Sequence, residues 1–245
     1  MSGGALQWPV PSETAWPRLA ATSDDAWLWL LDLDEAAGDG AAARSLLADD
    51  ERARAARFVF DVHRSRFVVC RAALRTLLAD RLGCAPGEVR FEYGPAGKPS
   101  LAGGGELRFN VSHSDRYALL GLAHGVELGV DIEHMRPLRD MDLVAARVFS
   151  PAERETLARV GPDRKVEAFF AGWTRKEAYI KARGEGIALL GAIEVALAPG
   201  DTPRLIRVNG QPAELDRWSI DAFTPVPGFA TAVCIEGRSR HWKTL

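Results

Sequence analysis

Two acidic residues that alternate along a short apolar segment are the first candidates for chemistry in this sequence. They are Asp131 and Glu133, in the segment Gly-Val-Asp-Ile-Glu at 129–133. In a β-strand both carboxylates point to one face, because alternate side chains share a face. Adjacent carboxylates repel one another, and hard oxygen ligands of this kind suit Mg²⁺. A polar outer face at the end of a strand is the plainer alternative, since this two-residue pattern is common.

A third carboxylate follows in the segment Phe-Ser-Pro-Ala-Glu at 149–153. Ser150, Pro151 and Glu153 have the types and spacing of a capping box at the start of a helix. That structural role explains the segment without any chemistry. Glu153 is also a candidate third ligand for the metal, although a carboxylate that caps a backbone amide is less free to reach a cation.

The segment 173–181 combines an acid with two lysines at helical spacing. Trp173, Lys176 and Glu177 lie at positions i, i+3 and i+4, and Lys181 follows four residues later, so we expect one helical stripe. Glu177 is then a candidate general base between two ammonium groups that neutralise phosphate charge. The structural alternative is a Glu177–Lys181 surface pair that contributes ~0.3–0.5 kcal/mol, with Trp173 in the core.

Two further segments favour contacts to phosphate. Ser112 and His113 end a predicted strand, and Ser112 lacks the flanking glycines of a hydrolase nucleophile elbow. Residues 51–81 hold eight arginines and His63 against three acidic residues, and arginine matches phosphate oxygens with its planar fork. A solvated arginine face on a helix is the alternative interpretation. Lys98 follows Gly97 but does not belong to a P-loop, because Pro99 replaces the required Ser or Thr.

The elements that must position these residues recur in the same order in two halves. The first half is predicted to contain a strand at 26–33, helices at 41–57 and 62–82, and strands at 89–93, 107–112 and 117–123, with a loop at 94–105. The second is predicted to contain a strand at 126–133, helices at 141–148, 151–160 and 163–183, and strands at 193–197, 204–208, 217–223 and 229–236. No element is predicted for residues 1–25 or 237–245.

This order predicts an α+β fold of two similar halves with pseudo-twofold symmetry, each a mostly antiparallel sheet covered by helices. We place the halves at residues 1–126 and 127–245. A groove between two such halves is a natural ligand site.

Composition excludes several other classes of protein. The 245 residues include 31 Lys and Arg against 33 Asp and Glu, and this net charge of −2 argues against a general nucleic-acid binder. The 47% of hydrophobic residues argue against disorder. No apolar run approaches the ~18 residues of a membrane span, and the first residues do not resemble a signal peptide. We therefore expect a cytoplasmic protein. Three scattered cysteines provide neither a disulfide framework nor a zinc site.

Taken in order, the motifs resemble those of the 4′-phosphopantetheinyl transferase family, in its Sfp-type branch with the pattern W-x-x-K-E-A. The resemblance covers about residues 50–185 by motif and nearly the whole chain by element order; its motifs are Lys98-Pro99 and residues 109–114, 129–133, 149–153 and 173–181. It implies the pseudo-dimeric 4′-phosphopantetheinyl transferase fold, a monomer, and a role in secondary metabolism. It also implies coenzyme A as substrate, bound with Mg²⁺, or with Mn²⁺ in its place.

The activity that this resemblance implies is that of a holo-[acyl-carrier-protein] synthase. Such an enzyme transfers the 4′-phosphopantetheine arm of coenzyme A to a Ser of an acyl or peptidyl carrier protein and releases adenosine 3′,5′-bisphosphate. No nucleic acid or membrane takes part.

The resemblance also implies a role for each candidate residue. The metal ligands are Asp131, Glu133 and Glu153. The catalytic residues are Glu177 as base, Lys181 on the reacting phosphate, and Lys176 as the other lysine of the motif. The contacts to coenzyme A are Arg54, Arg66, Lys98, Ser112, His113 and Lys181. The half 1–126 takes the adenine and 3′-phosphate, and the half 127–245 carries the metal and the catalytic helix. Glu51 and Phe67 depart from the family pattern, where some relatives have Lys and Thr.

Two alternatives stay open at this point. A coenzyme A-dependent acyltransferase would use the thioester of its substrate and would not need a metal. A non-catalytic carrier-binding protein would be expected to lose one of the carboxylates or Lys181, and the sequence retains all of them.

Overall fold

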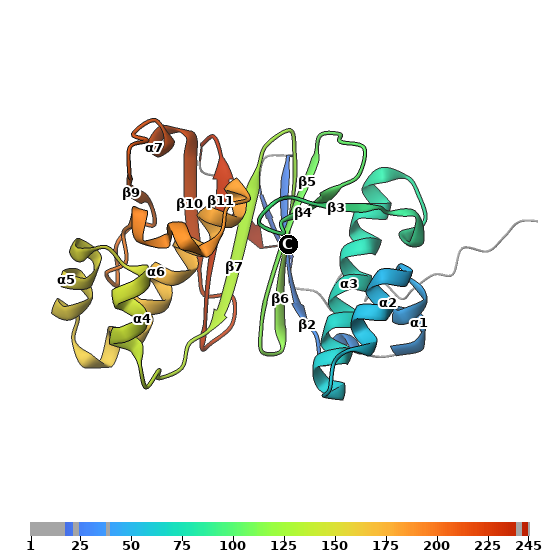
Figure 1. Cartoon of the computed structure of the whole chain (residues 1–245), viewed down its shortest axis with the longest axis horizontal. Coiled ribbons are helices and arrows are strands. Elements are labelled where there is room, and N and C mark those ends of the chain that lie inside the picture. The colour runs from blue at the N-terminus through green and yellow to red at the C-terminus, as the bar shows by residue number, and fades with distance from the viewer. Residues whose placement is uncertain (1–17, 22–24, 38–39, 239–241, 245) are drawn as a thin grey trace, which may run out of the picture.

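The two halves pack their sheets face to face and carry helices on the outer sides (Figure 1). The computed structural model describes residues 18–21, 25–37, 40–238 and 242–244. The expected α+β class with antiparallel sheets is confirmed. None of the helices in the described part of the chain combines the length and the apolar character of a membrane span.

The first half is built on a five-stranded antiparallel sheet in the order β12-β1-β2-β6-β5. Its strands are β1 (Arg18–Ala21), β2 (Ala26–Asp32), β5 (Leu107–Ser114), β6 (Tyr117–His124) and β12 (Trp242–Thr244). Its helices are α1 (Gly40–Ser45), α2 (Asp49–Ala56) and α3 (Asp61–Leu82), with the short 3-10 turns η1 (Glu35–Ala37) and η2 (Pro86–Glu88). The hairpin of β3 (Phe91–Tyr93) and β4 (Pro99–Leu101) extends towards the second half.

The second half is built on the three-stranded antiparallel sheet β10-β11-β7. Its strands are β7 (Leu128–His134), β10 (Trp218–Phe223) and β11 (Phe229–Glu236), and the separate pair is β8 (Ile193–Val195) and β9 (Leu205–Val208). Its helices are α4 (Met141–Val148), α5 (Pro151–Arg159), α6 (Pro162–Arg183) and α7 (Glu214–Arg217), with the 3-10 segment η3 (Ile187–Ala192).

Apolar side chains form a core on each face of each sheet. The helix α3 covers the outer face of the large sheet, where Leu74 and Leu78 pack with Leu120. The helix α6 covers the outer face of the small sheet, where Ile180 belongs to a separate apolar cluster. A third cluster lies between the sheets and joins residues of β2, β6, β7 and β11, Leu119 among them. The junction between the halves is therefore a true hydrophobic core rather than a surface contact.

The two long helices have the same length and the same kind of end. Both α3 and α6 contain 22 residues, and each is followed by a glycine in the left-handed conformation, Gly83 with φ of 66° and Gly184 with φ of 68°. Glycine adopts this conformation without the steric cost that a Cβ imposes. The predicted helix ends at these glycines are confirmed.

Besides α7 and the 3-10 segments, which were not expected, the structure differs from the expected elements in three main places. The single helix expected at 41–57 is divided into α1 and α2, and Glu51 accepts a hydrogen bond from the Ala48 amide at 3.0 Å, so a new helix starts there. The loop expected at 94–105 contains β4, which pairs with β3. Residues 18–21 and 242–244, for which no element was expected, form β1 and β12 and pair with each other. The last described strand therefore lies in the sheet of the first half.

Candidate active site

The carboxylates of Asp131 and Glu133 lie on the face of β7 that α6 covers. Gly129 belongs to the same face, and a Cβ at this position would lie 2.1 Å from the carbonyl oxygen of Ala178 in α6. Only glycine allows the two backbones to approach this closely. The close approach brings the last turns of α6, with Glu177 and Lys181, over the acidic face of β7.

Asp131 is the buried centre of this cluster, with 2% of its surface exposed. Its Oδ1 accepts hydrogen bonds from Lys181 Nζ at 2.6 Å and from Ser112 Oγ at 2.8 Å, and Lys181 Nζ also donates to Ser112 Oγ at 3.0 Å. Its Oδ2 is buried and has no hydrogen-bond partner among the described residues. Oδ1 of Asp131 thus accepts two hydrogen bonds, whereas Oδ2 is free to accept a further ligand.

Polar side chains of β5 hold β7 in register with the first half. Asn110 Oδ1 accepts a hydrogen bond from the Val130 amide at 2.9 Å. Ser114 Oγ donates to Glu133 Oε2 at 2.8 Å and accepts from the His134 amide at 3.1 Å. The cluster therefore lies at the junction of the two halves, with serines from one half on carboxylates from the other.

Glu177 joins the two carboxylates from α6. Burial raises its pKa to about 7, the negative charges of Asp131 and Glu133 raise it as well, and Lys181 opposes them. Burial and the charge of Asp131 also raise the pKa of Glu133. Mutual repulsion of this kind is what a bound cation would relieve, and a carboxylate with a pKa near neutrality is suited to accept a proton.

The structure does not bring Glu153 or Lys176 to this cluster. Glu153 accepts hydrogen bonds from the Ser150 amide at 2.7 Å and from the Val195 amide at 2.8 Å, and forms an ion pair with Lys176 at 2.5 Å. Lys176 is 0% exposed and donates its other hydrogen bonds to the carbonyl oxygens of Val148 and Leu190.

The predicted capping box is confirmed, and protein donors contact both oxygens of Glu153. The ammonium of Lys176 is buried among protein acceptors. Both residues connect α5 and α6 and act within the structure of the second half.

A group of positive charges approaches the cluster from the first half. The surroundings of His113 partly desolvate its imidazole and lower its pKa, and the charges of Lys181 and Arg54 lower it further. Arg54 is exposed on α2, with its guanidinium 5.2 Å from the ring centre of Phe67. Repulsion among these groups favours an anion between them.

Other arginines of the basic segment have internal partners instead. Arg66 binds Asp34 with two hydrogen bonds of 2.8 Å and Asp115 with a third of 2.9 Å, and these partners raise its pKa further. Arg71 and Arg75 pair with the buried carboxylate of Glu51. The expected contact of Arg66 to a phosphate would require it to leave two carboxylates. Arg71 and Arg75 do not form the solvated arginine face of the alternative interpretation, because both pair with Glu51.

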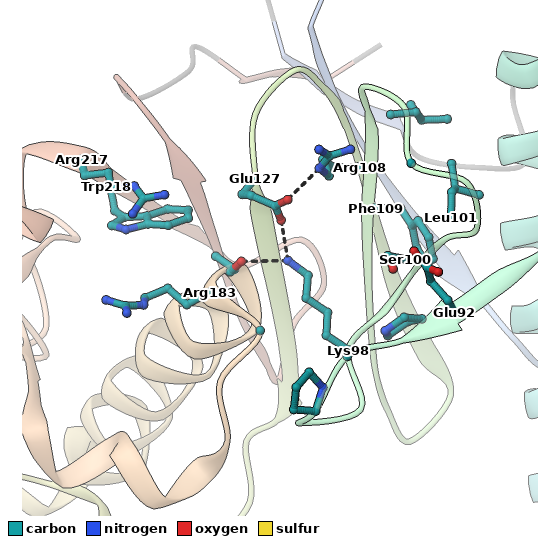
Figure 2. Close-up of a pocket in the computed structure, with 17 residues that line it drawn as sticks. Glu92, Lys98, Ser100, Leu101, Arg108, Phe109, Glu127, Arg183, Arg217 and Trp218 are labelled. Atoms are coloured by element: carbon teal, nitrogen blue, oxygen red, sulfur yellow. Dashed lines mark hydrogen bonds and ion pairs between the residues drawn. The ribbon is translucent and has the colours of Figure 1, made fainter.

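Lys98 connects the β3–β4 hairpin to the second half beside a cavity of about 600 Å³ (Figure 2). Its Nζ donates to Glu127 Oε2 and to the Ala182 carbonyl, both at 2.8 Å, while Arg108 binds the other oxygen of Glu127. Lys98, Arg108 and Glu127 line the cavity together with Arg183 and Trp218 on the opposite wall. Asp131, Glu133 and Glu177 are not among the residues that line this cavity.

The donor chemistry of the cluster fits a divalent cation. Carboxylate oxygens are the preferred ligands of Mg²⁺, and the buried Oδ2 of Asp131 lacks a partner within the described part of the chain. As positioned, no three His, Cys, Asp or Glu side chains of the described residues are gathered closely enough to hold a metal.

Sequence reasoning missed two features of this cluster. Glu177, rather than Glu153, is the acid that shares an environment with Asp131 and Glu133. Ser112 donates a hydrogen bond to Asp131, and Ser114 donates one to Glu133. The two serines are two residues apart in β5, and the two carboxylates are two residues apart in β7. This equal spacing was a signal in the sequence for the pairing.

The chain matches two sequence profiles that together span most of its length. The profile described as 4′-phosphopantetheinyl transferase, N-terminal, matches residues 37–124. The profile described as the 4′-phosphopantetheinyl transferase superfamily matches residues 127–234.

The chain is also similar to individual known proteins. The chain is 39% identical to the 4′-phosphopantetheinyl transferase HetI of Nostoc sp. over 224 residues, which cover 90% of this chain and 92% of the relative. It is 26% identical to the 4′-phosphopantetheinyl transferase Sfp of Bacillus subtilis over 192 residues, or 78% of this chain and 82% of the relative. A crystal structure of a holo-(acyl-carrier-protein) synthase from Bacillus anthracis in complex with coenzyme A covers 46% of this chain and 96% of its own, with 24% identity and a TM-score of 0.36.

The chain therefore belongs to the 4′-phosphopantetheinyl transferase family. It is a transferase, as the resemblance of its motifs implied.

Proposed function

We propose that this protein transfers the 4′-phosphopantetheine arm of coenzyme A to a serine of an acyl or peptidyl carrier protein. The observation that carries this proposal is the meeting of Asp131, Glu133, Glu177 and Lys181 at the junction of the two halves. Transfer of a phosphate group depends mainly on positioning and on neutralising charge. The cluster combines negative carboxylates, which suit a cation, with the positive ammonium of Lys181, which suits a diphosphate.

Each half contributes one part of the proposed site. The half 1–126 provides Arg54 and His113 for the adenine and 3′-phosphate end of coenzyme A, and the half 127–245 provides the metal ligands and the catalytic helix α6. Lys181 meets the reacting phosphate, which its ammonium reaches by leaving Asp131. Lys98 supports the nucleotide side through the hairpin that it holds on the end of α6.

Asp131 and Glu133 would hold Mg²⁺, with Glu177 as the further carboxylate within electrostatic reach. When bound, the cation would neutralise charge on the diphosphate and so stabilise adenosine 3′,5′-bisphosphate as the leaving group. Mn²⁺ can take the same place, because it accepts the same oxygen ligands. These residues replace the expected set that included Glu153.

Glu177 accepts the proton of the carrier serine during the attack. A carboxylate with a pKa of about 7 is a better acceptor at neutral pH than an ordinary glutamate. Lys181 lies one helical turn away and stabilises the ionised form of Glu177, so that proton acceptance and phosphate binding are coupled on one face of α6.

A single chain contains both halves of this site, so we propose that it acts as a monomer. We also propose that it acts in the cytoplasm, consistent with the free thiols of its three cysteines. Size-exclusion chromatography with light scattering tests the oligomeric state.

The test of the proposed activity is the intact mass of carrier proteins after incubation. The protein is mixed with coenzyme A, Mg²⁺ and a panel of apo-carriers from fatty-acid, polyketide and nonribosomal-peptide systems. We expect at least one carrier to gain the mass of one phosphopantetheine arm, and to lose this gain with EDTA. A parallel sample with acetyl-coenzyme A distinguishes an acyltransferase, which would add only the acetyl group and would tolerate EDTA. Carrier binding without any change of mass would indicate a non-catalytic protein.

A further inference from the structure

The turn between β5 and β6 lies directly beside the acidic cluster. Ser114, the last residue of β5, donates a hydrogen bond to Glu133 Oε2 at 2.8 Å and accepts one from the His134 amide at 3.1 Å. Asp115 follows in the turn, and its Oδ2 lies 4.0 Å from Nδ1 of His134. The conformation of this turn therefore sets how the first half meets the end of β7.

Asp115 has a backbone conformation that needs support. Its φ of 51° is left-handed, and in the described part of the chain it is the single residue other than glycine with a positive φ. A Cβ is sterically disfavoured in this region, which glycine adopts freely. The turn therefore depends on contacts that come from outside it.

Arg66 provides such a contact from α3. Its Nη1 donates to Asp115 Oδ1 at 2.9 Å, and its Nε and Nη2 donate to the two oxygens of Asp34 at 2.8 Å each. Asp34 is itself held, because its amide donates to Asp32 Oδ1 at 3.0 Å. The planar guanidinium of Arg66 is thus fixed by one carboxylate and presents a donor to the other.

We propose that Arg66 is a positioning residue of the active site, which holds Asp115 in its left-handed turn and so keeps Ser114 on Glu133. This inference rests on the proposed function, because it takes Glu133 as part of the site of transfer. It assigns Arg66 a role other than the expected contact to a phosphate. Loss of its guanidinium would displace Glu133 without removing any group that contacts the substrate.

Amide hydrogen exchange measured by NMR tests this path without any substrate, because the His134 amide donates to Ser114 Oγ. In Arg66→Met this amide should exchange about tenfold faster, because local opening of the turn exposes it. The Val130 amide, which donates to Asn110 Oδ1 at 2.9 Å, is the internal reference and should change by less than about twofold. Equal acceleration of both amides, or no acceleration at His134, would overturn the proposal.

Substitutions at position 115 separate the turn from the rest of the Arg66 contacts. Glycine adopts the left-handed conformation unaided, so adding Asp115→Gly to Arg66→Met should restore the His134 exchange rate to within about threefold of the native value. Asp115→Ala retains the pair of Arg66 with Asp34, and it covers the case in which Arg66→Met does not fold. It should accelerate exchange at His134 by about tenfold, because alanine is disfavoured in this turn. Failure of the glycine to restore the rate, or of the alanine to raise it, contradicts the proposed path.

The transfer assay connects this path to activity. With coenzyme A and an apo-carrier, kcat of Arg66→Met should fall by about tenfold, because the loss is one of positioning. The KM values for coenzyme A and dephospho-coenzyme A should change by the same small factor, and Asp115→Gly should restore kcat. The matched control is Arg81→Met on the same helix, where the guanidinium lies 4.1 Å from the ring centre of Trp27; its kcat should stay within about twofold of the native value.

Two kinetic outcomes would overturn the positioning role. A selective rise in the KM for coenzyme A would identify Arg66 as a ligand of the 3′-phosphate. Faster exchange at His134 with an unchanged kcat would mean that the turn does not serve the reaction. If the native protein modifies no carrier, the proposed function fails, and the exchange rate at His134 still decides whether Arg66 holds the turn.

Discussion

The raised pKa of Glu177 makes a quantitative prediction about folding stability without metal. Its carboxyl group has a pKa of about 7 in the folded chain, against 4.5 as the ordinary value. This difference corresponds to about 3 kcal/mol, since a tenfold change in an ionisation constant is about 1.4 kcal/mol. The folded state holds the proton more tightly than the unfolded state does. The free energy of unfolding therefore falls as the pH rises from about 4.5 to about 7, and is flat above that range.

The variant Glu177→Gln removes this titration and keeps the size of the side chain. At pH 4.5 the two proteins should have similar stability, because the native glutamate is protonated there in the folded state. At pH 8 the variant should be more stable by up to about 3 kcal/mol, with neighbouring carboxylates sharing part of the effect. Urea denaturation in EDTA at both pH values measures the difference.

The control for this experiment is Glu167→Gln on the same helix. Glu167 is exposed and pairs with Arg164, which lowers its pKa. Its loss should therefore destabilise the chain slightly at pH 8, by less than about 1 kcal/mol. A stability difference between the native chain and Glu177→Gln that is the same at pH 4.5 and pH 8 would refute the placement of Glu177 among the carboxylates.

Three further predictions follow from the same contacts. Lys176→Met should lower stability by about 3–5 kcal/mol, because it leaves Glu153 buried without its partner, and adding Glu153→Gln should restore part of the loss in urea denaturation. Gly129→Ala should lower stability by more than about 2 kcal/mol and abolish transfer, because its Cβ would overlap the backbone of α6; native stability and activity would contradict this. Arg54→Ala should weaken binding of coenzyme A more than that of dephospho-coenzyme A, whereas Arg66→Ala should weaken both equally and lower the melting temperature.

Local patterns in the sequence were sufficient to predict most helices and strands and the residues at which several of them begin or end. The glycines after α3 and α6 and the capping box of Ser150 and Glu153 act through neighbours a few residues away, so their types and spacing predict their structure. The strands β1 and β12 were not predictable in this way. Each is short, and their pairing joins residues near opposite ends of the chain.

For the candidate site, too, some features were predictable from the sequence and others were not. The alternation of Asp131 and Glu133 predicted two carboxylates on one face of a strand, because side chains in a strand have a period of two. The sequence also placed Lys176 and Glu177 in one functional stripe. Successive residues of a helix are about 100° apart, however, so these two face different neighbours. Lys176 points to Glu153, and Glu177 joins the acids of β7.

The sequence alone therefore determined two things. It fixed which types of residue are available for charge chemistry, and the periods of strand and helix fixed the face on which each one lies. Which charges meet was decided by the tertiary structure, because ion pairs form between residues distant in the chain. Arg66 could be recognised as an arginine suited to phosphate, but only the fold brings Asp34 and Asp115 to it. Lys181 meets Asp131 only because Gly129 lets α6 and β7 approach to backbone contact.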